Sequence, residues 1–288
     1  MHPFSFFLLI CALRFCFIYG DNPMAHADEP PKEKHHKDPA PSDAHVFFFE
    51  GFEREDYATH FNEASHPQNR ALISGDPVFD GRHSLRFTVR GGDHYGGSLS
   101  FVFSRAGMPE PEELYARYYL RLGPAWNPGR GGKLPGPSGT YDRAGWGGRK
   151  VNGTDGWSAR MGFASSKLRP GETQVYYYTY HADMPDQYGS NFLWGIEGRG
   201  SLKNERWYCI ETYVRLNTPG RNDGILRGWV DGALAMEKTD LRFRDTADLK
   251  IEKFWMNLYY GGSWSAPHDM DIYLDNVALS THPIGPAR

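Results

Sequence analysis

Cysteine is scarce in this chain of 288 residues, which contains three in all. Cys11 and Cys16 lie in an apolar stretch at the N-terminus, so a domain formed by the rest of the sequence has Cys209 alone. A single thiol can form neither an intramolecular disulfide nor a cysteine metal cluster. Cys209 stands in the apolar-rich run "RWYCIETYV", which predicts a buried and unreactive thiol.

A large excess of charge of either sign is absent as well. The sequence has 32 basic and 35 acidic residues and a formal net charge of −3. Such a balance gives no overall field that would recruit nucleic acid or an anionic membrane. We therefore expect a monomer with no nucleic-acid partner and no stable protein partner. Any preference for a polyanion has to arise from a local site.

Long hydrophobic runs are confined to the N-terminus, where an apolar stretch extends from Phe4 to Tyr19. This stretch is short for a bilayer span, and the small-x-small sequence "AHA" follows it. These features predict a signal peptide over residues 1–27 and a secreted or periplasmic protein. No Lys or Arg precedes the stretch and Arg14 interrupts it, so an uncleaved anchor is the alternative. Residues 28–45, rich in Pro, Lys, Asp and His, predict a disordered linker.

Helical periodicity is nearly absent from Val46 onward, and only "PEPEELYARY" offers a plausible helical start. Instead, apolar and polar residues alternate with period two between clusters of Gly, Pro, Asn and Asp. The dipeptide Asp231-Gly232 is a strong hairpin signal within "ILRGWVDGALAMEK". Strands are predicted at 84–90, 98–104, 113–122, 156–163, 175–183, on both sides of that dipeptide, 253–262 and 271–280.

This pattern predicts one all-β domain over residues 46–288. The chain is 40% hydrophobic and 15% aromatic, which is enough for one sizeable core. Many short strands with Gly-rich connections, and no alternation of strand and helix, favour an antiparallel β-jelly-roll or concanavalin-like sandwich. One sheet of such a fold often curves, so we expect a concave substrate groove on it.

The stretch "GGKLPGPSGTYD", residues 131–142, places one lysine among four glycines and two prolines. Proline disfavours both a helix interior and a central strand, so the stretch offers Lys133 little structural purpose. Lys133 is therefore a candidate functional residue.

Two predicted strands carry polar side chains on one face. In "GWSARMGF", Ser158 and Arg160 alternate with four core-forming residues, and in "VYYYTYHAD", Tyr176, Tyr178 and Tyr180 share a face. For a lone strand, an exposed polar face or ordinary strand aromatics would explain the pattern. If the two strands pair, however, three phenols lie beside a hydroxyl and a guanidinium.

Together with Lys133, these groups suit β-elimination in a uronic-acid polysaccharide. That reaction removes the proton at C5, next to a carboxylate whose charge must be neutralised for the carbanion to form. Arginine and lysine can neutralise the carboxylate, arginine as a bidentate fork. A tyrosine with a lowered pKa can act as acid or base, and a desolvated Lys133 could be the base instead. The residues leave the division of these roles open.

Several motifs occur in a fixed order from about Tyr115 to Ser280: "YARYYLRL", "GGKLPG", "GWSAR", the Y-x-Y-x-Y strand, "YVRLNTPGRNDGILRGWVDG", "LRFR" and "YYGGS…DIYLDN". This series resembles the polysaccharide lyase family 14 type of domain, which includes alginate and glucuronate-polymer lyases. The resemblance implies a β-jelly-roll that cleaves an acidic polysaccharide by metal-independent β-elimination. It also implies unsaturated product ends and no cofactor, while the choice of uronate and endo or exo action stay open.

The resemblance also implies catalytic residues. The lysine of the family's K-L-P-G motif matches Lys133, and the serine and arginine of its S-x-R motif match Ser158 and Arg160. Its Y-x-Y pair falls within three alternating tyrosines, of which we favour Tyr176 and Tyr178.

Four further residues are candidates for substrate binding: Tyr180, Arg117, Arg244 and Tyr141. The insert "PSGTYDRAGWGGRKVN", residues 137–152, is longer than the family pattern and should border the groove. We therefore expect it to influence the choice of substrate.

A metal site and other functions remain as alternatives. Asp269, Asp271, Asp275 and Asn276 could bind a structural Ca²⁺, although such polarity is common at turns and strand edges. A glycoside hydrolase would need two carboxylates facing one groove, and the spacing Glu-x-Asp-x-x-Glu is absent. A non-catalytic carbohydrate-binding jelly-roll protein of the cell envelope is the main alternative, because it would use the same aromatic groove. A structural envelope protein with a lyase-like fold is a third.

Overall fold

The computed structural model describes residues 45–287. The predicted signal peptide, residues 1–27, and the predicted linker as far as residue 44 lie outside the described residues. Within 45–287 no helix is long and apolar enough to cross a membrane. The helices there are short 3₁₀ turns: η2 Tyr57–Thr59, η3 Pro67–Asn69, η4 Ser104–Ala106 and η5 Ile196–Gly198.

The first of two sheets has eight strands in the order β15-β14-β13-β6-β17-β4-β3, with β1 also paired to β17. Neighbouring strands in it are antiparallel. Its strands are β1 Val46–Glu50, β3 Arg70–Ser74, β4 His83–Val89, β6 Glu113–Leu122, β13 Trp207–Arg215, β14 Gly224–Val230, β15 Ala233–Leu241 and β17 Met270–Ser280.

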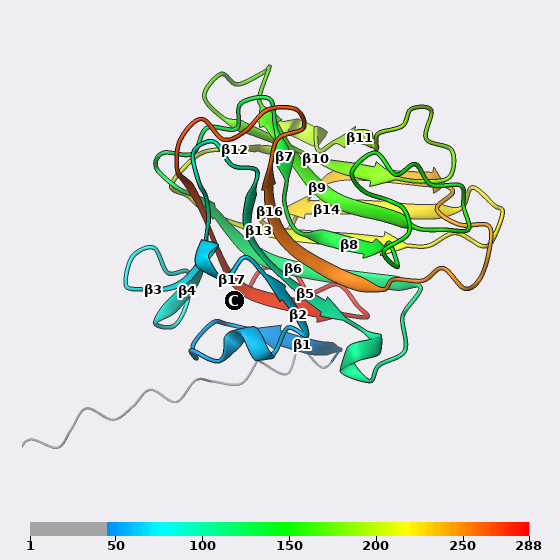
Figure 1. Ribbon diagram of the computed structural model, residues 1–288, viewed down its shortest axis with the longest axis horizontal. Helices are drawn as coiled ribbons and strands as arrows, with labels where there is room; N and C mark the ends of the chain where they lie inside the picture. The colour runs from blue at the N-terminus through cyan, green and yellow to red at the C-terminus, as the bar shows by residue number, and fades with distance from the viewer. Residues whose placement is uncertain (1–44, 288) are drawn as a thin grey trace, which may run out of the picture. The chain divides into compact units, whose positions relative to one another are not determined.

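The second sheet has nine strands and is also antiparallel. Its main order is β11-β10-β9-β7-β16-β5-β2; β12 pairs with β10, and β8 pairs with β16 and β9 (Figure 1). Its strands are β2 Glu63–Ser65, β5 Tyr95–Val102, β7 Gly132–Lys133, β8 Gly136–Gly139, β9 Trp157–Ser165, β10 Thr173–Tyr180, β11 Ser190–Leu193, β12 Ser201–Leu202 and β16 Lys253–Tyr260.

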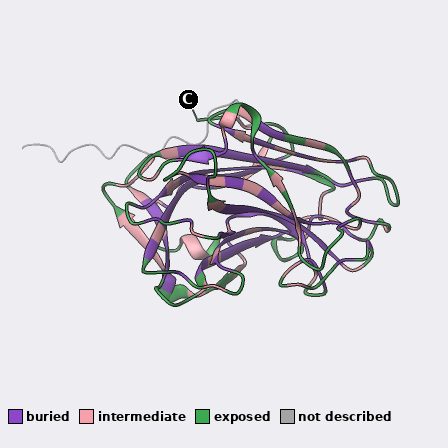
Figure 2. Ribbon diagram, turned by 90° about the horizontal axis from the view of Figure 1, so that it is seen from above, coloured by how far each residue is buried: buried purple, intermediate pink, exposed green. Residues whose placement is uncertain are grey.

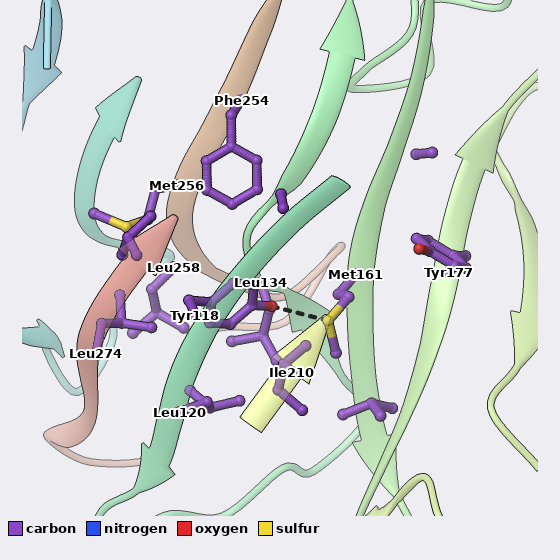
Figure 3. Close-up of a cluster of buried hydrophobic side chains, with 14 of the residues drawn as sticks. Tyr118, Leu120, Leu134, Met161, Tyr177, Ile210, Phe254, Met256, Leu258 and Leu274 are labelled. Carbon is purple, nitrogen blue, oxygen red and sulfur yellow. Dashed lines mark hydrogen bonds between the residues drawn. The ribbon is translucent and has the colours of Figure 1, made fainter. Parts of the chain in front are cut away.

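Apolar side chains from the two sheets form one core. Leu120 on β6 and Ile210 on β13 belong to the same buried cluster as Met161 on β9 and Phe254 on β16 (Figure 3). The hydroxyl of Tyr118 donates a hydrogen bond of 2.9 Å to Met161 Sδ, which joins the two layers. Burial is concentrated in the strands, whereas the connecting loops are largely exposed (Figure 2). Removal of this apolar surface from water stabilises the two-layer arrangement.

The predicted all-β fold is confirmed as an antiparallel β-jelly-roll. β14 and β15 form the predicted hairpin, and Asp231 and Gly232 have the positive φ values, 52° and 79°, that a tight hairpin turn requires. The segment "PEPEELYARY" does not begin a helix. The alternate apolar residues from Leu114 to Leu122 all pack in the core, so burial on one face makes this segment strand β6.

One face of the second sheet is turned away from the core, and we call it the site face. Met161 and Tyr177 point into the core, so their neighbours in the sequence, Arg160 and Tyr178, point to the site face. The register of β9 and β10 places Tyr178 directly opposite Arg160. Phenols and guanidinium therefore lie side by side, as the sequence predicts for paired strands.

Candidate active site

Lys133 reaches the site face on the two-residue strand β7, between β9 and β16. Its register partners are Gly162 on β9 and Tyr259 on β16. Gly132 approaches β16 so closely that a Cβ atom there would lie 2.1 Å from the carbonyl oxygen of Tyr259. Gly131 has a φ of +115°, which favours glycine. The glycines of this stretch thus allow the backbone to wedge Lys133 between two strands.

The Lys133 ammonium lies over an aromatic ring rather than beside a carboxylate. Its Nζ atom is 3.8 Å from the ring centroid of Tyr178. Burial, with a smaller effect of the Arg160 charge, lowers the pKa of Lys133 to about 7. Among residues 45–287, Lys133 has no salt-bridge partner. At neutral pH much of Lys133 is therefore the free amine, which can accept a proton.

Arg160 is the second cation of the site and is only 5% exposed. Its guanidinium carbon lies 4.2 Å from the ring centroid of Trp255 on β16. Burial lowers its pKa to about 10, so it remains charged at neutral pH. Within the described part of the chain, Arg160 has no carboxylate partner and its Nε atom has no hydrogen-bond acceptor. An anion placed here would supply both the missing counter-charge and a hydrogen-bond acceptor for Nε.

The tyrosines Tyr176 and Tyr178 share the site face but differ in their hydrogen bonds. Tyr176 donates its hydroxyl to the carbonyl oxygen of Phe163 at 3.3 Å, and burial raises its pKa to about 12. The Tyr178 hydroxyl accepts a bond of 3.2 Å from the backbone N–H of Gly189, which leaves its own proton out of that bond. Burial is also the main cause that raises the pKa of Tyr178. A side-chain hydrogen bond to Tyr180 adds to this rise. Tyr178 is the tyrosine whose ring contacts the Lys133 ammonium.

Ser158 and Tyr180 lie on the site face but beneath the insert of residues 137–152. Ser158 Oγ donates to the carbonyl oxygen of Gly145 at 2.6 Å, and the Tyr180 hydroxyl accepts from the Gly148 backbone N–H at 3.0 Å. Both residues are fully buried. Ser158, predicted to be catalytic, and Tyr180, predicted to bind substrate, thus use their hydroxyl groups to hold the backbone of the insert.

Arg117 and Arg244, predicted to bind substrate, do not lie on the site face. Arg117 is on β6 in the first sheet, where it donates to the carbonyl oxygen of Gly285 at 3.2 Å. Arg244 follows β15 and donates to the Glu112 carboxylate at 2.5 Å and to the carbonyl oxygen of Asn217 at 2.9 Å. The sequence pattern indicated strand faces for these arginines. It did not show beside which sheet each of them lies.

Tyr141, also predicted to bind substrate, anchors the start of the insert. Its hydroxyl donates to the Glu110 carboxylate at 2.6 Å and accepts from the backbone N–H of Lys250 at 3.0 Å. The hydroxyl is thus used by the protein itself, and Tyr141 is not grouped with Lys133.

A cavity of about 730 Å³ lies beside the first sheet, between Glu112, Asp223 and Arg244. It does not adjoin the site face. The guanidinium of Arg244 within it is already paired with Glu112. We place the candidate active site at Lys133 because the cations there lack such partners.

Two aromatic residues of the site were not singled out from the sequence. Trp255 and Tyr259 alternate along β16 with the core residues Phe254, Met256 and Leu258, and they share the site face with Lys133. The signal was present in "KFWMNLYY", where large side chains occupy both faces. Aromatic side chains on the outer face of a strand beside buried cations are candidates for ligand contact.

The residues considered as an alternative Ca²⁺ site have other partners in the structure. Asp269 pairs with Arg90 at 2.6 Å, Asp271 accepts from Thr88, and Asp275 accepts from backbone N–H groups that include that of Asn276. Among residues 45–287 no group of three or more His, Cys, Asp or Glu side chains could hold a metal ion. Cys209 is buried and free, as predicted, and burial raises its pKa to about 12.

The fold and the site together define a β-jelly-roll domain with an aromatic, cationic surface on one sheet. The model of the family Polysaccharide lyase 14 matches residues 83–277. The chain therefore belongs to the polysaccharide lyase 14 family, and the protein is a lyase that acts on polysaccharides. No curated protein matches its sequence significantly.

Solved structures of lyases share this fold. A variant of alginate lyase Aly36B in complex with an alginate tetrasaccharide has 21% sequence identity and a TM-score of 0.65, over 83% of this chain and 95% of that one. The PL-14 alginate lyase from Aplysia kurodai has 20% identity and a TM-score of 0.60, over 80% and 93%. An endo-β-1,4-glucuronan lyase from the fungus Trichoderma reesei has 15% identity and a TM-score of 0.57, over 82% and 96%.

Proposed function

We propose that the protein is an exported lyase that cleaves a uronic-acid polysaccharide of the alginate or glucuronan type by β-elimination. The observation that carries this proposal is the buried guanidinium of Arg160, which lies near the half-buried Lys133; neither side chain has a carboxylate partner among residues 45–287. Buried charge is costly without a counter-ion, and a uronate carboxylate can supply one. The similar lyases named for alginate and glucuronan support this substrate class.

Arg160 is the group that binds the uronate carboxylate in this proposal. Its guanidinium is packed on Trp255, and Nε has no protein acceptor in the described chain. Hydrogen bonds from this fork neutralise the carboxylate and stabilise the negative charge that develops when the neighbouring C5 loses its proton. The mechanism invokes no metal ion, because the positive charge comes from the guanidinium.

Lys133 and Tyr178 are the proton acceptor and donor. The neutral Lys133 amine takes the C5 proton, and the electron pair of the C–H bond becomes the C4–C5 double bond. The C4–O4 bond breaks as the Tyr178 hydroxyl protonates the departing oxygen, leaving an unsaturated end on one product. A base with a pKa of about 7 is suited to neutral pH, and the raised pKa of Tyr178 keeps its proton available until O4 departs.

The test is release of unsaturated ends, measured by ultraviolet absorbance, when the purified protein meets alginate, glucuronan and related polyuronates. Lys133→Arg retains a positive charge but cannot act as base, so we expect a loss of turnover of at least about 10²-fold. Lys133→Ala and Arg160→Ala should lose activity to a similar degree. Exposed Lys167 and Arg221 provide matched control variants, Lys167→Ala and Arg221→Ala, which should behave as wild type.

The outcomes separate the enzyme from a binding protein. Full activity of Lys133→Arg with a normal melting temperature would show that Lys133 is not the base. Binding of a polyuronate by the wild-type protein, without unsaturated ends on any of these polymers, would instead support a carbohydrate-binding function.

A further inference from the structure

Aromatic side chains continue along the site face beyond Lys133, over β16, β5 and the residue that follows β2. We call this group the aromatic ledge; it consists of Tyr259, Tyr95, His66 and His94. The ring centroids of Tyr259 and Tyr95 are 5.2 Å apart, and those of Tyr95 and His66 are 5.1 Å apart. His94 stacks on Tyr259 at 5.8 Å. The proposed reaction uses none of these residues.

A β-bulge brings Tyr95 to the site face. The pairing of β16 with β5 shifts register between Asn257 and Tyr259, so that Tyr95 lies opposite Tyr259. Without this shift, strand alternation would put Tyr95 on the same side as the core residue Leu99. Packing leaves room only for glycine at position 97, because a Cβ atom there would lie 2.3 Å from the ring of the core residue Phe87. Bulges of this kind re-aim side chains next to active sites.

Tyr95 is exposed, held in place and free to bind a ligand. Its side chain is 56% exposed. The His66 ring stacks on it with an interplanar angle of 6°, and Asn69 donates to the Tyr95 carbonyl oxygen at 2.8 Å. Within the described chain, the hydroxyl groups of Tyr95 and Tyr259 have no hydrogen-bond partner. A pre-positioned aromatic group loses little conformational entropy when it binds.

The aromatic ledge is continuous with the candidate active site. Tyr259 is the direct register partner of Lys133, and Tyr95 lies on the next strand beyond it. Because neighbouring strands are about 4.8 Å apart, Tyr95 lies roughly 10 Å from Lys133 across the sheet. A polysaccharide that crosses the strands over Lys133 would therefore reach the ledge with sugar residues close to the cleaved bond.

We infer that the aromatic ledge binds further sugar residues of the same uronate polymer, an inference that rests on the proposed function. The apolar faces of the sugar rings pack against Tyr95 and Tyr259, whose hydroxyl groups bond to sugar oxygens. His66 and His94 each use Nδ1 within the protein, bonded to Ser65 Oγ and to a backbone carbonyl oxygen. Their Nε2 atoms have no partner within residues 45–287 and add further polar contacts to the ligand.

The test compares a short and a long substrate in Tyr95→Ala. Binding is measured by calorimetry, and turnover by release of unsaturated ends, with a uronate disaccharide and with the polymer. We expect affinity and kcat/KM for the polymer to fall about tenfold, through KM, while values for the disaccharide change less than about twofold. Tyr115→Ala is the matched control, because Tyr115 stacks on Tyr213 in the first sheet and should alter neither substrate's values.

Each outcome decides between alternatives. An equal loss on both substrates would place Tyr95 at the cleaved bond, and no loss on either would mean that the ledge binds no sugar; both overturn the inference. A further outcome is that the wild type releases no unsaturated ends while its binding of the polymer still depends on Tyr95. That result would contradict the proposed function but support sugar binding by the aromatic ledge. Should Tyr95→Ala not fold, His66→Ala removes the supporting ring and should show a smaller, polymer-specific loss.

Discussion

The surroundings of Lys133 lower its pKa to about 7. The side chain is buried next to Arg160, and the Tyr178 ring lies beneath its ammonium. Burial penalises the charged form, and with no carboxylate nearby the penalty is not offset. The same arrangement leaves Arg160 charged and without a counter-ion, so one residue is prepared to accept a proton while its neighbour is prepared to bind an anion.

The pH dependence of kcat/KM follows from the lowered pKa of Lys133, about 7. The active form is the neutral amine, whose fraction grows as pH rises through the pKa. We therefore expect kcat/KM to increase about tenfold per pH unit below pH 7 and to level off above it. Initial rates on a polyuronate at constant ionic strength check this. A rate that falls as pH rises from 6 to 8 would contradict the role of Lys133 as base.

The sequence predicted the residues of the site better than their contacts. Period-two alternation, together with the pairing of β9 and β10, places Arg160 and Tyr178 on one face of the sheet. The resemblance to a family singled out Ser158 and Arg160 together, yet only one of them is free to meet a ligand. The Ser158 hydroxyl is bonded to the carbonyl oxygen of Gly145. Gly145 lies in a loop, and no local sequence pattern shows the path of that loop.

At the scale of elements, the insert of residues 137–152 is attached to the paired strands β9 and β10. Ser158 on β9 and Tyr180 on β10 each hold one of its backbone groups. The exposed side chains of Arg149 and Lys150 lie on the same insert. The side chains of the catalytic strands thus position a basic loop beside the site, in keeping with the expected influence of the insert on substrate choice.

Ser158→Ala tests this attachment. The change leaves the Gly145 carbonyl oxygen without its buried partner, so we expect a loss of about 1–3 kcal/mol of stability but only a few-fold change in turnover below the melting temperature. Thermal unfolding and initial rates measure the two effects. Ser165→Ala is the control, because Ser165 makes a similar bond to the Gly129 carbonyl oxygen in an exposed place and should cost much less. Loss of turnover with unchanged stability would return Ser158 to a catalytic role.

Elements with strong alternation were predictable, and irregular ones were not. β6 and the hairpin of β14 and β15 follow from residues within the segment itself. Strand β7 has two residues and exists only because β9 and β16 leave room between them. The bulge at Gly97 likewise depends on the pairing of β5 with β16. A feature that depends on pairing with a neighbouring strand cannot be predicted from the local sequence pattern alone.

At the scale of the whole domain, both sheets depend on one shared core, so the site face relies on packing far from it. Leu274 on β17 in the first sheet is fully buried in this core (Figure 3). Damage to either sheet should therefore unfold both together.

Leu274→Ala tests this shared core. Its cavity should cost about 2–5 kcal/mol, and the unfolding should remain a single transition. Urea unfolding followed by circular dichroism measures the cost. Leu168→Ala is the matched control, because Leu168 is 83% exposed, and its effect should stay within about 0.5 kcal/mol. Two separate transitions in Leu274→Ala would show that the sheets fold independently.

Strand β17 comes last in chain order but lies between β6 and β4, and it also pairs with β1. These earlier strands leave the ribosome long before their partner has been translated. The first sheet can therefore not close until Ser280 has emerged, and pairings over such sequence distances form slowly. The position of one strand thus ties closure of the first sheet to the synthesis of residues 270–280.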